Sequence, residues 1–185
     1  MHIKPVDQEP NLYSVIDVMP AALVSKILAT SWLDLPWQQP PGQSTHSRRQ
    51  ILDSALPWAL EWDLACHAVC AEISAAVNHD MGDYVNTVWW LDEPGYHEPI
   101  HSNNHGANCM HLYWIGARVD LGSVFFWYFD AGSRRYQFAH AANSAYVTVS
   151  RPNQDGTQNF LWNGMLEPVP RNTFRLSSQV CFGTP

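Results

Sequence analysis

Apolar and polar residues follow two different periods along the chain, and the period changes near Gly82. Before that point apolar residues recur mainly at helical spacing, apart from a loosely alternating run at Leu12–Val18 that predicts a short strand. After it, runs rich in β-branched and aromatic residues are separated by turn signals. The pattern predicts one domain over residues 1–185, with a helical part at 1–82 and a β-rich part at 83–185.

Two amphipathic helices are predicted in the first part. One begins near Pro20 and presents an apolar face made of Leu23, Val24, Ile27 and Leu28. The other begins at Asp53 or Ser54, both acceptable N-caps, and ends at Gly82 as its C-cap. Its apolar positions keep helical spacing: Leu60, Leu64, Val69, Ile73 and Val77.

The second part reads as a series of short strands. They are Tyr84–Leu91, Met110–Ile115, Ser123–Phe129, Arg135–His140, Ala145–Ser150, Phe160–Trp162 and Thr173–Phe182. The sequence Asp92-Glu-Pro-Gly95 is typical of a turn. Because no helix between these strands is long enough for a crossover, an antiparallel sandwich or barrel is predicted.

Composition narrows the class of protein. With 46% hydrophobic and 15% charged residues the chain is globular, and its nine tryptophans suit either a Trp-rich core or the walls of a ligand cleft. A net charge of −7 argues against nucleic-acid binding. The polar segment 1–10 does not resemble a signal peptide, and no apolar run reaches the roughly 20 residues of a membrane span. We therefore expect a cytoplasmic protein whose four cysteines, which form no CxxC pair, are reduced.

Four histidines crowd one segment between two predicted strands: His97, His101, His105 and His111. Imidazole is a good ligand for first-row metals, and Glu98 and Asn103 add oxygen donors in the same segment. The segment is thus a candidate metal site, with a solvated loop carrying incidental histidines as the alternative. No phosphate-binding glycine loop or serine nucleophile elbow is present in the sequence.

The order of these features over Tyr84–Phe182 resembles the iron(II)/2-oxoglutarate-dependent oxygenases, and most closely the prolyl-4-hydroxylase-like branch. The shared features are a strand, a Pro-Gly turn, a histidine motif, further strands, and an arginine on the last strand. The resemblance implies a mainly β (α+β) fold, a double-stranded β-helix or jelly roll with the N-terminal helices packed on one sheet. It also implies Fe(II) and 2-oxoglutarate as cofactors, with two histidines and one carboxylate holding the metal.

Carried over residue by residue, the metal ligands of the family fall on His101, Asn103 and Asn163. His101 matches the first histidine, Asn103 stands at the position of the acid, and Asn163 stands at that of the second histidine. Two of the three positions therefore depart from the pattern. An amide supplies a neutral oxygen where a carboxylate would neutralise charge or an imidazole would give nitrogen, so iron binding is expected to be weakened.

The cosubstrate position is better matched. Arg175 corresponds to the arginine that pairs with the far carboxylate of 2-oxoglutarate, and Ser177 lies two residues on, on the same strand face. Tyr113 could add a hydroxyl, whereas Trp114 has the opposite strand parity, so only one of the two points inward. As a strand-borne cleft residue, Arg175 is expected to be replaceable by alanine without loss of folding.

Three interpretations stay open. The protein binds a metal, recruiting His97, His105 or His111 beside His101, and oxidises a small-molecule or amino-acid substrate. Alternatively, it is a catalytically inactive relative that binds a ligand, or a cupin-like jelly roll that uses another pocket. The sequence does not indicate the oligomeric state.

Overall fold

The computed structural model describes residues 1–6, 9–40, 48–52, 55–80, 82–99, 101–102, 109–115, 126–129, 135–138, 143–150, 162–165, 168–171 and 174–183. The helices are α1 (Ala21–Ala29), the short 3-10 helix η1 (Trp32–Asp34) and α2 (Ala59–Val77). The strands are β1 (His2–Val6), β2 (Glu9–Ile16), β3 (Arg48–Leu52), β4 (Asp83–Asp92), β5 (His101–Ser102), β6 (Cys109–Ile115), β7 (Phe126–Phe129), β8 (Arg135–Phe138), β9 (Ser144–Ser150), β10 (Trp162–Met165) and β11 (Arg175–Gly183).

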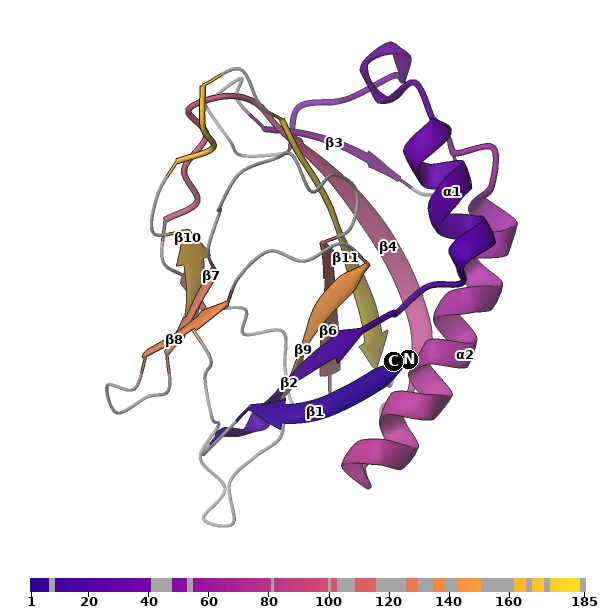
Figure 1. The fold of residues 1–185 in the computed structure, drawn as a ribbon, viewed down its shortest axis with the longest axis vertical. Helices are drawn as coiled ribbons and strands as arrows, with labels where there is room; N and C mark the ends of the chain where they lie inside the picture. The colour runs from indigo at the N-terminus through magenta and orange to yellow at the C-terminus, as the bar shows by residue number, and fades with distance from the viewer. Residues whose placement is uncertain are drawn as a thin grey trace.

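The strands pair antiparallel in two sheets. The large sheet has seven strands in the order β1-β2-β9-β6-β11-β4-β3, and the small sheet has four in the order β5-β10-β7-β8. In Figure 1, α1 and α2 lie along one side of the large sheet, while β7, β8 and β10 of the small sheet lie on its other side. The large sheet is therefore a middle layer, with helices on one face and the small sheet opposite the other.

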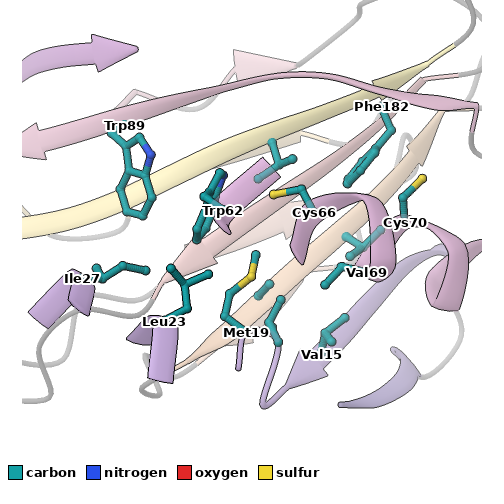
Figure 2. Packing of buried hydrophobic residues seen from close by; sticks show 14 of the residues in the cluster. Val15, Met19, Leu23, Ile27, Trp62, Cys66, Val69, Cys70, Trp89 and Phe182 are labelled. Atoms are coloured by element: carbon teal, nitrogen blue, oxygen red, sulfur yellow. The ribbon is translucent and has the colours of Figure 1, made fainter. Parts of the chain in front are cut away.

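The main hydrophobic core fills the space between the helices and the large sheet. Figure 2 shows buried side chains of the helices, among them Ile27 and Trp62, facing those of the strands, among them Trp89. Strand alternation explains this arrangement, because Leu176, Val180 and Phe182 of β11 are core residues at alternate positions. The indole Nε1 of Trp62 donates to Thr87 Oγ1 of β4 at 2.8 Å, which satisfies a buried donor.

Tryptophans supply much of this core. The rings of Trp62 and Trp89 are 4.7 Å apart, and Trp58 and Trp32 stack around Trp89 at 5.3 and 5.2 Å. Each such aromatic pair adds about 0.5–1.5 kcal/mol beyond area burial. Of the two interpretations of the Trp-rich composition, these four residues support the core.

Both predicted helices are confirmed, although details of α2 differ. It begins at Ala59, not at Asp53 or Ser54, and its C-cap is Asn78, which adopts the left-handed conformation (φ 49°) that was expected at Gly82. Leu60 and Leu64 are exposed, so the predicted apolar face is wrong in the first turns. The buried face comprises Trp62, Cys66, Val69, Cys70 and Ile73. None of the helices in the described ranges has the length and apolar character needed to cross a membrane.

The predicted mainly β character is confirmed, with strand ends that shift by a few residues. Three strands were not predicted: β1 and β3 in the first part of the chain, and the two-residue β5 at His101–Ser102. The shift with most consequence is that of β4, which continues to Asp92, a residue that the sequence assigns to a turn. The predicted strand Phe160–Trp162 overlaps β10, described over Trp162–Met165, at Trp162, and residues 160 and 161 lie outside the described ranges.

Candidate functional site

The face of the large sheet that looks away from the helices carries a row of charged residues across three strands. In the register of the sheet, Arg48 of β3 and Arg175 of β11 both lie opposite Asp92 of β4. Residues directly opposite in an antiparallel pair have neighbouring side chains on one face. The three side chains are almost fully buried, at 6%, 1% and 0% relative exposure for Arg48, Arg175 and Asp92.

Asp92 is the shared partner of both guanidinium groups. Arg48 donates from Nε to Asp92 Oδ1 at 2.6 Å and from Nη2 to Oδ2 at 3.2 Å, a bidentate pair. Arg175 donates from Nε to Asp92 Oδ2 at 2.7 Å, and its Nη2 also contacts this carboxylate. Removing Asp92 would take the shared anion away from two buried guanidinium groups. Even one buried charge without a partner is strongly destabilising.

Glu98, in the segment that connects β4 to β5, completes the network from the other side. Arg48 donates from Nη1 to Glu98 Oε1 at 2.7 Å and from Nη2 to Oε2 at 3.2 Å, and Arg175 Nη2 lies 3.6 Å from Oε2. Burial disfavours the charged carboxylate, but the charges of Arg48 and Arg175 outweigh it and hold the pKa of Glu98 below its ordinary value. We call Arg48, Asp92, Glu98 and Arg175 the charge network.

Two aromatic rings enclose Arg48 further. Its guanidinium carbon lies 4.4 Å from the centre of the Tyr96 ring and 4.9 Å from that of Trp90, which is cation–π distance. Burial, reinforced by the charge of Glu98, raises the pKa of Tyr96, so its hydroxyl stays protonated at neutral pH. Arg48 is thus held by ring contacts as well as by ion pairs.

His101 and Asn163, assigned to the metal position by the sequence, are brought together. His101 of β5 lies directly opposite Asn163 of β10 in the small sheet. The Nδ1 of His101 is 2.9 Å from the carbonyl oxygen of Pro99. Because that oxygen only accepts, Nδ1 carries the proton, and the lone pair of the neutral ring is on Nε2. Metal-binding histidines are commonly oriented by such a bond.

Backbone hydrogen bonds connect this pair to the charge network. Met165, two residues after Asn163, donates its N–H to the carbonyl oxygen of Glu98 at 3.0 Å. Gly95 donates to Val169 at 2.8 Å, and Val169 donates to Tyr96 at 2.8 Å. The β4–β5 connection therefore runs along the chain that follows Asn163, which keeps Glu98 and His101 beside β10. The positive φ of Gly95 (86°) allows the turn that makes this possible.

Of the other predicted ligands, the described part of the chain places only His97 and the backbone of His111. His97 is exposed, and Asn103 and His105 lie outside the described residues. His111 lies opposite Cys181 and Thr148 in the register of the large sheet. Within the described part of the chain, no three His, Cys, Asp or Glu side chains gather as a metal-binding group. Among the described residues, the imidazole of His101 and the amide of Asn163 are therefore the donors on which a metal site could be built here.

Two of the predicted cosubstrate residues, Arg175 and Ser177, share the strand face of the charge network. Ser177 is buried and lies opposite Trp90, two residues along from the Arg175–Asp92 pair. Tyr113 occupies a register position opposite Gln179 and Tyr146. The premise that Arg175 is a cleft residue outside the buried interior is wrong, because its side chain is buried and ion-paired with Asp92. Its replacement by alanine is therefore expected to destabilise the fold.

Three members of the charge network were not predicted as cosubstrate-binding residues. Arg48 stands in a short basic pair, Asp92 in an apparent turn, and Glu98 in the histidine segment as one more oxygen donor. Side chains alternate between the two faces of a strand, so extending the predicted strand Tyr84–Leu91 by one residue would have placed Asp92 on the same face as Trp90. This alternation is the sequence signal that could have revealed Asp92.

A separate cavity of about 470 Å³ lies on the helix side of the same strands. Its lining includes Leu91 and Leu176, the sequence neighbours of Asp92 and Arg175, together with Leu28, Trp32 and Phe174. Strand alternation places it on the face opposite to the charge network, so the two are distinct features.

Comparison with solved structures identifies the fold. The prolyl-4-hydroxylase of Pseudomonas putida has a TM-score of 0.66 and 12% sequence identity, over 94% of this chain and 93% of that one. A prolyl hydroxylase of Trichoplax adhaerens, in complex with a peptide fragment of the hypoxia-inducible factor degradation domain, has a TM-score of 0.65 and 9% identity, over 94% and 84%. The epimerase SnoN of nogalamycin biosynthesis, in complex with Fe3+, α-ketoglutarate and nogalamycin RO, has a TM-score of 0.64 and 12% identity, over 94% and 78%.

A scan against protein-family models gave no match, and a search of curated protein sequences gave no significant one. The likeness is therefore one of structure. The chain has the fold of the 2-oxoglutarate- and iron-dependent oxygenases, and the predicted resemblance to that superfamily and its prolyl-hydroxylase-like members is confirmed at this level.

Proposed function

We propose that the protein is an iron(II)- and 2-oxoglutarate-dependent oxygenase on a jelly-roll fold, which carries out a hydroxylase-type oxidation. The observation that carries the proposal is the pairing of His101 with Asn163 across β5 and β10, next to the segment that reaches Arg175. From β4 to β11 the chain passes repeatedly between the two sheets, which supports a jelly roll.

A metal would be held by His101 and Asn163, with Asn103 as the third proposed ligand. The orientation of His101 fits this role, since Nε2 carries the lone pair. The donor set is neutral, so it supplies none of the charge compensation that a carboxylate gives, and weak metal binding is expected. When bound, iron(II) would supply the redox chemistry by which dioxygen, as the oxidant, converts 2-oxoglutarate to succinate and CO2 and hydroxylates the substrate.

Arg175 is the proposed anchor for the far carboxylate of the cosubstrate, with Ser177 and Tyr113 as proposed hydroxyl donors. The planar guanidinium suits a carboxylate, and burial strengthens the pair by excluding water. Because Arg175 donates from Nε to Asp92, its guanidinium group is already oriented before a ligand binds. This orientation lowers the entropic cost of binding.

The proposed substrate is a small organic molecule or an amino-acid side chain. Among structures of this fold, one is in complex with a peptide fragment and another with nogalamycin RO, so the fold accommodates both kinds of compound. The net charge of −7 favours a neutral or basic substrate through the long-range field of the protein.

A second candidate function is ligand binding without redox chemistry. It is favoured by one observation, the internal neutralisation of Arg175 by Asp92 and Glu98. In this case the same region would hold an organic ligand, and the amides at positions 103 and 163 would reflect the loss of a metal.

Succinate formation separates the two. The full chain is incubated with iron(II), ascorbate and 2-oxoglutarate, and succinate is measured against a metal-free control. The oxygenase predicts iron-dependent turnover that is lost in His101→Ala and retained in His79→Ala, a matched histidine beyond the end of α2. No turnover, together with no stoichiometric iron by elemental analysis, would leave only the binding protein.

A further inference from the structure

The two arginines of the charge network are neutralised by two carboxylates that come from different parts of the fold. Asp92 lies on a strand and accepts from the Nε atoms of both Arg48 and Arg175. Glu98 lies in the β4–β5 connection and meets the terminal nitrogens, at 2.7 and 3.2 Å from Arg48 and 3.6 Å from Arg175. Two cations and two anions leave the buried group without net charge.

Glu98 is the member nearest to solvent. Its side chain is 16% exposed, compared with 6% for Arg48, 1% for Arg175 and 0% for Asp92. Its contact to Arg175 is also longer than a hydrogen bond. Of the two carboxylates, Glu98 is therefore the one that another carboxylate could replace.

We propose that Arg48 and Arg175 together form a carboxylate-binding site, that Glu98 is its internal occupant, and that an external carboxylate binds by displacing the Glu98 side chain. The inference rests on the proposed function only in taking Arg175 as the anchor of a 2-oxo acid. It adds Arg48 as a second binding residue and Glu98 as a competitor.

The exchange needs no opening of the chain. The carbonyl oxygen of Glu98 accepts from Met165 N at 3.0 Å, so the backbone stays in place while the side chain rotates outward. Arg48 keeps its bidentate pair with Asp92 and its contacts with the rings of Tyr96 and Trp90. The incoming carboxylate restores neutrality, which is the electrostatic condition for burying two guanidinium groups.

Glu98→Gln tests this directly, because it keeps the size of the side chain and removes its charge. Binding of 2-oxoglutarate to the full chain is followed by the shift in thermal unfolding, read by tryptophan fluorescence, with and without iron(II). We expect Glu98→Gln to bind 2-oxoglutarate at least about tenfold more tightly than the wild type. Glu93→Gln is the matched control, since Glu93 pairs with the half-exposed Arg49 outside the network, and its affinity should equal that of the wild type.

The double variant Arg48→Gln/Glu98→Gln removes one charge of each sign and keeps the Arg175–Asp92 pair. It should lose most of the gain, because the second guanidinium is gone. If Glu98→Gln does not fold, Glu98→Asp retracts the carboxylate by one methylene and should bind about threefold more tightly than the wild type.

The proposal is overturned if Glu98→Gln binds no more tightly than the wild type, or if the gain persists in the double variant. The failure of the proposed function looks different. A Glu98→Gln protein that binds 2-oxoglutarate more tightly but forms no succinate with iron(II) would contradict the oxygenase and support the carboxylate site.

Discussion

The two faces of the large sheet are built from neighbouring residues of the same strands, yet opposite interactions stabilise them. On the helix side, Leu176 and Trp89 pack into an apolar core with Trp62. One residue away from Leu176, on the other face, Arg175 enters a buried ionic network with Asp92. Burial on the first side is favourable in itself, whereas burial on the second is tolerated only because the charges are paired.

This difference has a consequence for function. A core residue can be exchanged for another apolar residue of similar volume at small cost. A buried ion pair fixes a side chain in one orientation and offers charge to a ligand, at a cost in desolvation. The helix side therefore supports the sheet, and the network side is where a site for a polar ligand could form.

The largest effect is expected from Asp92→Ala. It leaves Arg48 and Arg175 buried with only Glu98 to compensate them, and should lower the free energy of unfolding by about 5 kcal/mol. Urea unfolding followed by tryptophan fluorescence measures it. A loss below about 1 kcal/mol would show that water reaches both guanidinium groups and that the network is not buried.

Trp62→Ala should have the next largest effect. It removes a fully buried ring that contacts Trp58 and Trp89, so the free energy of unfolding should fall by about 4 kcal/mol. Unlike Asp92→Ala, it should leave the charge network intact. The affinity for 2-oxoglutarate, measured by calorimetry under conditions where the variant is folded, should then stay unchanged; a parallel loss would contradict the separation of the two faces.

Acid should act on the network side through Glu98. Because the pKa of Glu98 is lower in the folded protein than in the unfolded chain, its ionic contribution to stability is full above the unfolded value of about 4.3 and is lost as the pH falls through the folded value. The stability of the wild type should therefore decrease more steeply below about pH 4 than that of Glu98→Gln. Thermal unfolding at a series of pH values gives both curves, and parallel curves would contradict the ion pairs of Glu98.

The smallest effect is expected from Arg49→Gln, a contrast with the adjacent Arg48. Arg49 pairs with Glu93 where both side chains are partly solvated, at 48% and 28% exposure, so its loss should cost at most about 0.5 kcal/mol. Urea unfolding against the wild type is sufficient. A cost near that of Asp92→Ala would mean that exposure does not decide what these pairs contribute.

The helix side was largely predictable from the sequence, and the network side was not. Periodicity revealed α1, α2 and the long strands β4 and β11, because each buries a regular apolar face. The edge strands β1 and β3 were not predicted, because an edge strand rich in polar residues shows little alternation of apolar and polar positions.

The charge network depends on contacts that no local pattern encodes. Asp92 is 44 residues from Arg48 and 83 from Arg175, and it ends a strand inside a sequence typical of a turn. The pairing of His101 with Asn163 could be anticipated only through the resemblance to a family, because β5 has two residues and no periodicity.

The most direct test of the account is metal-dependent binding of 2-oxoglutarate to the full chain, measured by isothermal titration calorimetry under anaerobic conditions with and without iron(II). The proposed function predicts that iron(II) tightens binding in the wild type and has no effect in His101→Ala, which lacks the imidazole opposite Asn163. Equal binding with and without iron(II), or the same iron dependence in His101→Ala, would contradict a metal centre at this position.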